Sequence, residues 1–137
     1  MDEGFWLPID ATQSDQVNWI SNETIVRYLR SMRAKQILVI ADSCFAGTLT
    51  RGFQVTQSTI TKTPGVSRLK SRTVLASGGL EPVIDSGGSG HSVFADALLS
   101  SLGAARSTVE AHQLFIEIRQ RVRLEANQSP AYSNVRR

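Results

Sequence analysis

The feature that most constrains the fold of this chain is a short, unbroken apolar run, QILVIA, at residues 36–41. The run is too short for a helix that stands alone, and its Val and Ile residues favour a strand. Because polar residues do not alternate with apolar ones, we expect both faces of this strand to be covered, as in the parallel sheets of α/β proteins. The run therefore predicts an α/β fold.

A helix is predicted before this run and a second strand after it. Ser21 or Asn22 can cap the helix, because the side chains of both residues accept hydrogen bonds from free backbone amides. Its apolar face comprises Ile25, Leu29 and Met32. Residues 72–77 have the composition of the second strand.

Two further helices are predicted towards the end of the chain. Ser92 can cap the first, which Gly103 ends, and Ser107 with Glu110 forms a capping box for the second. The residues expected to face inward are Phe94, Ala97, Leu98 and Leu102 in the first helix, and Ala111, Leu114, Phe115, Ile118 and Val122 in the second. In the segment after these helices, Pro130 is expected to interrupt any regular secondary structure. Strands and helices in this order are typical of an α/β protein.

Length and charge exclude several classes of protein. The 137 residues allow one domain, since domains average about 150 residues. Fifteen Lys and Arg against twelve Asp and Glu leave a net charge of +3, too small to predict a nucleic-acid-binding protein. No apolar run approaches the roughly 20 residues of a membrane span, and the first residues do not form a signal peptide. We therefore expect a cytoplasmic protein that binds neither nucleic acid nor membrane.

The single cysteine, Cys44, follows the predicted strand in the segment DSCFAG, residues 42–47. In parallel α/β sheets ligands bind beyond the carboxyl ends of the strands, and Gly47 allows the chain to turn sharply there. A lone cysteine cannot form an internal disulfide or a Cys-rich metal site. From the residues alone, Cys44 is either a reactive thiol at the mouth of a site or a small buried apolar side chain.

Several blocks of the sequence resemble the caspase-like peptidases of bacteria, which are relatives of metacaspases and caspases. The blocks are GFWLPIDA, NWISN, ILVIADSCFAGTLTR, VLASGGLEPVIDSG and GHSVFADALL. The most specific of them is the Asp-Ser-Cys turn after an apolar strand. The resemblance implies a caspase-like, mostly parallel sheet flanked by helices, with residues 1–137 forming part of the peptidase domain, shortened at both ends. It also implies a cysteine endopeptidase that cleaves peptides or proteins after Arg or Lys.

The resemblance assigns roles to three residues. Cys44 matches the nucleophile, which attacks the scissile carbonyl and forms a thioester. Asp42 matches the acid of the pocket that selects Arg or Lys, where a carboxylate can pair with a cationic side chain. Glu81 lies where the family often has another pocket acid. The alternative for Asp42 is a carboxylate that accepts backbone hydrogen bonds at the end of the strand.

The general base is not found where the resemblance implies it. A thiol of ordinary pKa is only a few per cent thiolate at about pH 7, so a cysteine peptidase needs an imidazole beside the sulfur. The caspase pattern has this His about 50 residues before the Cys, but none of the 43 residues that precede Cys44 is His. The resemblance thus puts the base ahead of Met1. Within the chain only His91, whose alternative role is a hydrogen bond at the start of a helix, and His112 remain.

Metal and cofactor chemistry is not expected. Zinc needs three or four ligands, and the sequence does not group them around either His. The residues after Cys44 do not form the acidic cluster that calcium-binding metacaspases use. A second function stays open, namely a non-catalytic caspase-like module that binds peptides or its relatives without cutting them. The sequence does not predict the oligomeric state.

Residues 48–72 are predicted to form a long, exposed loop. The segment is rich in Ser and Thr and has no acidic residue. Its basic residues are Arg51, Lys62, Arg68, Lys70 and Arg72. Caspase-like enzymes often cut themselves between the nucleophile and the following strands, and the resemblance places this loop there. We therefore expect the loop to be a site of self-cleavage.

Overall fold

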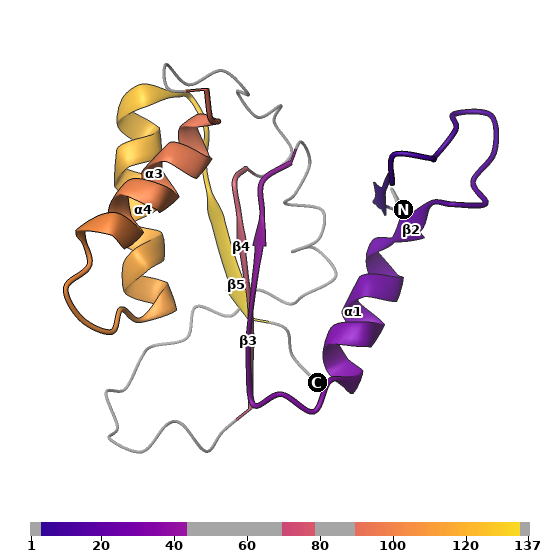
Figure 1. The fold of residues 1–137 in the computed structure, drawn as a ribbon, viewed down its shortest axis with the longest axis horizontal. Coiled ribbons are helices and arrows are strands. Elements are labelled where there is room, and N and C mark those ends of the chain that lie inside the picture. Colours follow the sequence, from indigo (N-terminus) through magenta and orange to yellow (C-terminus); the bar gives the residue numbers. More distant parts are fainter. Residues whose placement is uncertain (1–3, 44–69, 79–89, 135–137) are drawn as a thin grey trace.

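The computed structural model describes residues 4–43, 70–78 and 90–134. A short antiparallel pair, β1 and β2, precedes helix α1, and the remaining strands form one sheet against which α3 and α4 pack (Figure 1). The elements are β1 (Phe5–Trp6), β2 (Ile20–Ser21), α1 (Asn22–Ser31), β3 (Gln36–Ala41), β4 (Ser71–Ala76), α3 (Val93–Ala104), α4 (Ala111–Glu125) and β5 (Ala131–Asn134).

The sheet has the strand order β3-β4-β5. The two predicted strands, β3 and β4, pair in parallel, from Gln36 opposite Ser71 to Ala41 opposite Ala76. Strand β5 pairs with β4 in the antiparallel direction. The α/β class predicted from the sequence is confirmed, and the tail beyond Pro130 forms a strand where the sequence pattern indicated only a break.

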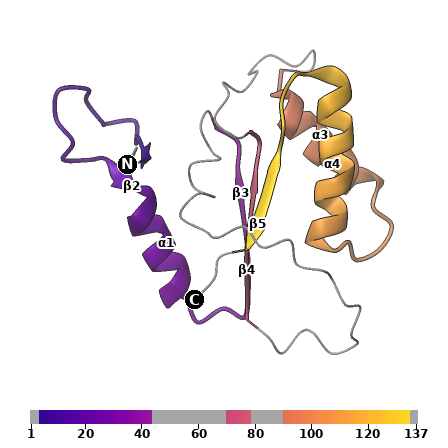
Figure 2. The same ribbon diagram turned by 180° about the vertical axis from the view of Figure 1, so that it is seen from behind.

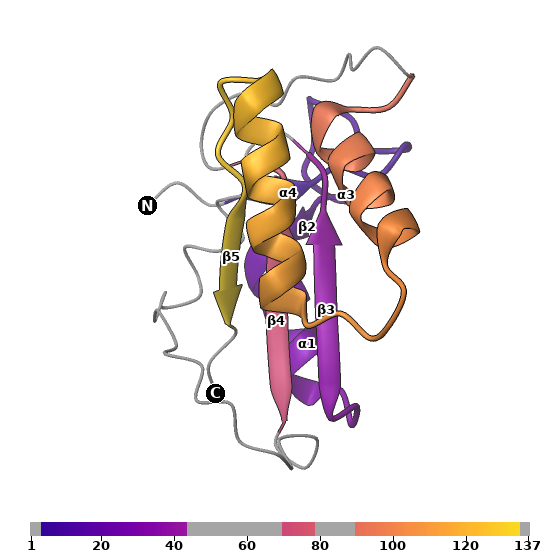
Figure 3. The ribbon, with the colours of Figure 1, turned by 90° about the vertical axis from the view of Figure 1, so that its left-hand side faces the viewer.

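Helix α1 covers one face of the sheet, and α3 with α4 covers the other. Figure 2 shows the sheet between these helices from behind, and Figure 3 shows α4 and α3 in front of the strands with α1 beyond them. Adjacent side chains of β4 serve opposite faces, since successive residues of a strand point to opposite sides. Val74 packs with Val26 of α1, and Leu75 packs with Phe94 and Ile118 on the other side.

The predicted cap of α1 is confirmed, but its buried face differs from the prediction. Ser21 is the N-cap residue, and its Oγ accepts a hydrogen bond from the amide of Thr24 at 3.2 Å. Val26 and Leu29 are the buried residues. Met32, expected on the inner face, is 46% exposed because it is the C-cap residue, where the chain leaves the helix for β3.

Helix α3 also begins as predicted and ends differently. Ser92 is its N-cap residue, and Phe94 and Ala97 are buried in the core. Leu102, expected to face inward, is half exposed. Gly103 does not end the helix, which continues to Ala104. The prediction failed because the buried face of α3 is set by packing against α4 and not by apolar spacing alone.

In α4 the predicted apolar stripe is confirmed at Leu114, Ile118 and Val122. The capping box is wrong. The helix starts at Ala111 with Glu110 as its N-cap residue, and no side chain caps the free amides. Ser107 lies too far before the first turn to reach them, since a capping side chain bonds to amides two or three residues ahead.

Strand β3 is only partly covered, although we expected both of its faces to be buried. Val39 packs towards α1, whereas Leu38 and Ile40 on the opposite face are 42% and 43% exposed. This is the face that α3 and α4 cover at Leu75, which lies opposite Ile40 in the neighbouring strand. Within the described residues, the helix pair therefore covers the centre of the sheet better than its β3 side.

The first residues of β4 correct the predicted loop. Residues 48–69 lie outside the described part of the chain, but Ser71 and Arg72 belong to β4, and Arg72 is buried. The guanidinium of Arg72 donates hydrogen bonds to the carbonyls of Leu29 at 2.6 Å and Met32 at 2.9 Å. Arg72 is therefore a structural residue that binds the carboxyl end of α1, where the unpaired carbonyls of a helix attract a cation.

Candidate active site

The candidate site lies where β3 and β4 end side by side. The parallel register brings Ala41 next to Ala76, and the chain continues from these residues to Asp42 and Ser77. The amide of Ser77 donates to the carbonyl of Ala41 at 2.9 Å. In return, the amide of Ser43 donates to the hydroxyl of Ser77 at 3.2 Å. The Ser77 side chain thus continues the ladder beyond the strands and fixes the backbone one residue before Cys44.

A buried amide side chain holds Ser77 from the other side. Ser77 is fully buried, and its carbonyl accepts a hydrogen bond from Nε2 of Gln128 at 2.5 Å. Gln128 is itself buried and lies between α4 and β5. A buried polar group without a hydrogen-bond partner destabilises the folded protein. The amide of Gln128 provides such a partner for the carbonyl of Ser77, which lies just beyond the end of β4. It ties the segment before β5 to the end of β4.

The carboxylate of Asp42 is exposed and contacts the start of α3. Its Oδ2 accepts a hydrogen bond from Oγ of Ser92 at 2.5 Å. The same Ser92 oxygen accepts the amide of Ala95 at 2.9 Å and so caps α3. The positive end of the helix dipole also favours an anion at this position. Among the described residues, the partner of Asp42 is a side-chain hydroxyl and not the backbone amides of the alternative interpretation.

Two of the predicted site residues, Cys44 and Glu81, lie outside the described residues. The third, Asp42, lies at the carboxyl end of β3, as the sequence predicted. Sequence reasoning identified Ser92 as a helix cap but missed its contact with Asp42, and it missed the roles of Ser77 and Gln128. Ser77 carried a weak signal, because it is the last residue of a predicted strand and precedes two glycines. No local pattern pointed to Gln128.

The two histidines differ in their surroundings. His112, on α4, packs its ring against Tyr132 of β5, with ring centroids 5.4 Å apart, and lies beside Phe115. These ring contacts give His112 a packing role in the structure. His91 is exposed and directly precedes Ser92, so it lies at the same end of the sheet as Asp42.

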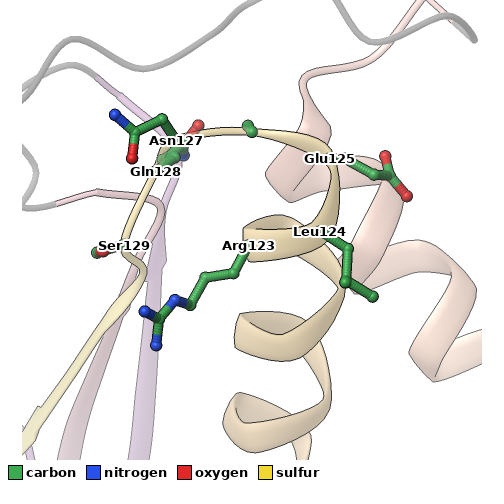
Figure 4. A pocket seen from close by; sticks show the side chains of 7 residues that line it. Arg123, Leu124, Glu125, Asn127, Gln128 and Ser129 are labelled. Carbon is green, nitrogen blue, oxygen red and sulfur yellow. The ribbon is translucent and has the colours of Figure 1, made fainter.

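A hollow of about 400 Å³ lies at the carboxyl end of α4. One continuous segment, residues 123–129, lines it. Figure 4 shows Leu124 and Glu125 on the side of the helix opposite Ser129. Because no group of reactive or titratable side chains from different elements converges there, we do not assign a site to it.

The part of the chain that the structure describes contains no cluster of three or more His, Cys, Asp or Glu side chains. Across residues 4–43, 70–78 and 90–134, no helix has the length and apolar character needed to cross a membrane.

Comparison with protein families gives a match to the caspase domain over residues 2–137. The match covers nearly the whole chain, and the chain therefore belongs to the caspase-domain family. Membership indicates a cysteine-type peptidase that acts on peptide or protein substrates. Comparisons with curated proteins and with solved structures give no match.

Proposed function

We propose that this chain carries the nucleophile and the specificity pocket of a cysteine endopeptidase that cleaves after Arg or Lys. Cys44 is the nucleophile. Its thiolate attacks the scissile carbonyl, the C–N bond breaks, the amine leaves with a proton from the base, and water hydrolyses the resulting thioester. The observation that carries the proposal is the fixed turn at Asp42 and Ser43, at the parallel strand ends of a caspase-domain protein.

Asp42 provides the charge that selects a basic residue, and Glu81 is the second pocket acid. The carboxylate of Asp42 is exposed, and no Lys or Arg within the described ranges neutralises it. An anion that is free of internal ion pairs can pair with the guanidinium or ammonium group of a substrate. The cytoplasm suits such an enzyme, because a reducing compartment keeps Cys44 as a thiol.

The base is a His from outside residues 1–137. None of the residues before Cys44 is His, and His112 is engaged in ring packing. We therefore expect the isolated chain to hydrolyse Arg or Lys peptides far more slowly than the same chain supplied with the family's His-bearing segment. Rapid, Cys44-dependent hydrolysis by the isolated chain would point to His91 instead.

Alkylation of Cys44 tests the nucleophile and the pocket without needing turnover. A peptide chloromethyl ketone ending in Arg forms a carbon–sulfur bond with the thiolate and releases chloride. We expect it to label Cys44 about tenfold faster than the matched citrulline compound, which is neutral and of the same shape. Asp42→Ala should remove this difference and leave alkylation by iodoacetamide unchanged, whereas Asp10→Ala, an exposed control, should preserve it.

The outcomes of this experiment separate the two functions. Equal labelling by the Arg and citrulline compounds in the unsubstituted chain would contradict the basic specificity. A Cys44 that resists even iodoacetamide in the folded protein would be a buried apolar residue, and the non-catalytic module would then be the better description.

Self-cleavage follows from the same specificity. We expect cuts after Arg51, Lys62, Arg68 or Lys70 when the chain is combined with the His-bearing segment. A cut after Arg72 is not expected, because this residue is buried in β4 and binds α1. Mass spectrometry should find no cuts in the Cys44→Ala chain. Equal nicking of both chains would show that the segment is merely sensitive to other proteases.

A further inference from the structure

The hydroxyl of Ser92 performs two tasks at once. It donates its hydrogen to Oδ2 of Asp42 and accepts the amide of Ala95. A serine hydroxyl has only one hydrogen, so the donation to Asp42 excludes any other acceptor. The amide of Ala95 in turn fixes the position of the oxygen. The side chain of Asp42 is thus held from an element 50 residues away in the sequence.

The anchor of this contact is rigid, whereas Asp42 itself is exposed. Val93 and Phe94, directly after Ser92, are buried in the core that α3 shares with α4. An exposed aspartate after the end of a strand would otherwise exchange among rotamers and lose entropy on binding a ligand. The hydrogen bond to Ser92 selects one orientation before any ligand arrives.

The contact also leaves half of the carboxylate free. Oδ2 is engaged by Ser92, and within the described residues Oδ1 accepts no hydrogen bond. A hydrogen bond to an ionised acceptor is stronger than one between neutral groups, so Ser92 can hold the carboxylate without neutralising its charge. A free oxygen of fixed direction suits a guanidinium, whose donors have a rigid geometry.

We propose that Ser92 is a positioning residue for Asp42, which orients the carboxylate so that Oδ1 meets the cationic side chain of the substrate. The reference to a substrate rests on the proposed function. The orientation of Asp42 by Ser92 does not, and it can be measured separately.

Three substitutions at Ser92 separate orientation from helix capping. Ser92→Ala removes both the cap and the hydrogen bond to Asp42. Ser92→Asp keeps a good cap but has no hydrogen to donate and repels the carboxylate. Ser92→Thr keeps both roles. The matched control is Ser21→Ala, because Ser21 caps α1 in the same extended conformation and with the same bond to an amide, but its hydroxyl contacts Thr24 and no carboxylate.

The first measurement is the ratio of the labelling rates of Cys44 by the Arg and citrulline chloromethyl ketones. We expect the ratio to fall about tenfold in Ser92→Ala and Ser92→Asp, and to be retained in Ser92→Thr and Ser21→Ala. If both Ser92→Ala and Ser92→Asp keep the ratio while Asp42→Ala loses it, the positioning role is overturned and the proposed specificity stands.

The second measurement is a double-mutant cycle of Asp42→Ala and Ser92→Ala in denaturant unfolding. We expect the loss of stability in the double variant to be smaller than the sum of the two single losses. Additive losses would overturn the contact itself. If the unsubstituted chain shows no preference for the Arg compound, the proposed specificity for basic residues is wrong. The proposal that Asp42 binds a cationic side chain is then wrong as well. The cycle then decides whether Ser92 orients the carboxylate at all.

Discussion

At the scale of single residues, buried polar side chains connect elements that are distant in the sequence. Arg72 is the clearest case, because its guanidinium reaches from β4 to the last carbonyls of α1 and is buried there. Its donors satisfy carbonyls that a helix cannot satisfy itself. Removing such a donor leaves polar groups unpaired in a place with little water, which costs more than the hydrogen bonds contribute.

Arg72→Met should therefore lower the free energy of unfolding by about 2–3 kcal/mol. Methionine keeps the apolar stem of the side chain and loses only the guanidinium. Arg27→Met, at an exposed position of α1, is the control and should change stability by less than about 0.5 kcal/mol. Chemical denaturation monitored by circular dichroism measures both. Equal effects would mean that the guanidinium of Arg72 has no stabilising role.

At the scale of elements, α4 shows how packing and capping contribute separately. Its buried stripe at Leu114, Ile118 and Val122 faces the core, whereas Ile116 on the other side is 44% exposed. Its amino end has no side-chain cap, because Glu110 occupies the N-cap position without bonding to the first amides. The helix thus depends on its packed face for stability.

Ile118→Ala should cost about 2–5 kcal/mol, because it removes buried methyl groups and leaves a cavity among Leu75 and Phe94. Ile116→Ala makes the same chemical change on the exposed face of the same helix and should cost less than about 1 kcal/mol. Urea denaturation of both variants measures the difference. Similar losses for the two would contradict the packing described for α4.

Glu110→Ser should stabilise the protein by about 0.5–1 kcal/mol. Serine at the N-cap position can accept a hydrogen bond from an amide of the first turn, as Ser21 does in α1 and Ser92 does in α3. Ser107→Ala is the control, since the sequence pattern alone would assign the cap to Ser107 and predict a loss. Thermal unfolding tests both. A loss of stability in Ser107→Ala with no gain in Glu110→Ser would restore the capping box.

At the scale of the whole molecule, β4 joins the two halves of the core. Val74 packs with the α1 side and Leu75 with the α3 and α4 side. Both residues are fully buried. The two faces share one strand, so neither can lose its packing without disturbing the other.

The protein should therefore unfold in one cooperative transition. Trp6 packs on the α1 side of the sheet, and in a Trp19→Phe background its fluorescence reports on that face. Among the described helices, α3 and α4 comprise 12 and 15 residues against 10 in α1, so they contribute more than α1 to the circular dichroism at helix wavelengths. We expect the two signals to give the same midpoint in urea. Separate midpoints would show that the faces fold independently.

The sequence by itself determined the local elements. The apolar run of β3, the caps Ser21 and Ser92, and the stripe of α4 follow from interactions between residues a few positions apart, which a sequence pattern records. Asp42 was placed at a strand end for the same reason. The resemblance of the blocks around Cys44 led to the caspase-domain family, which the match over residues 2–137 confirms.

Only the tertiary structure decided which polar groups of different elements form hydrogen bonds with each other. The contacts of Arg72 with Leu29, Asp42 with Ser92, and Ser77 with Gln128 span 43, 50 and 51 residues. No local pattern encodes such pairs, because a hydrogen bond between distant segments depends on where the fold brings them. The exposure of Leu38 and Ile40 has the same origin, since an apolar strand does not specify which helices cover it.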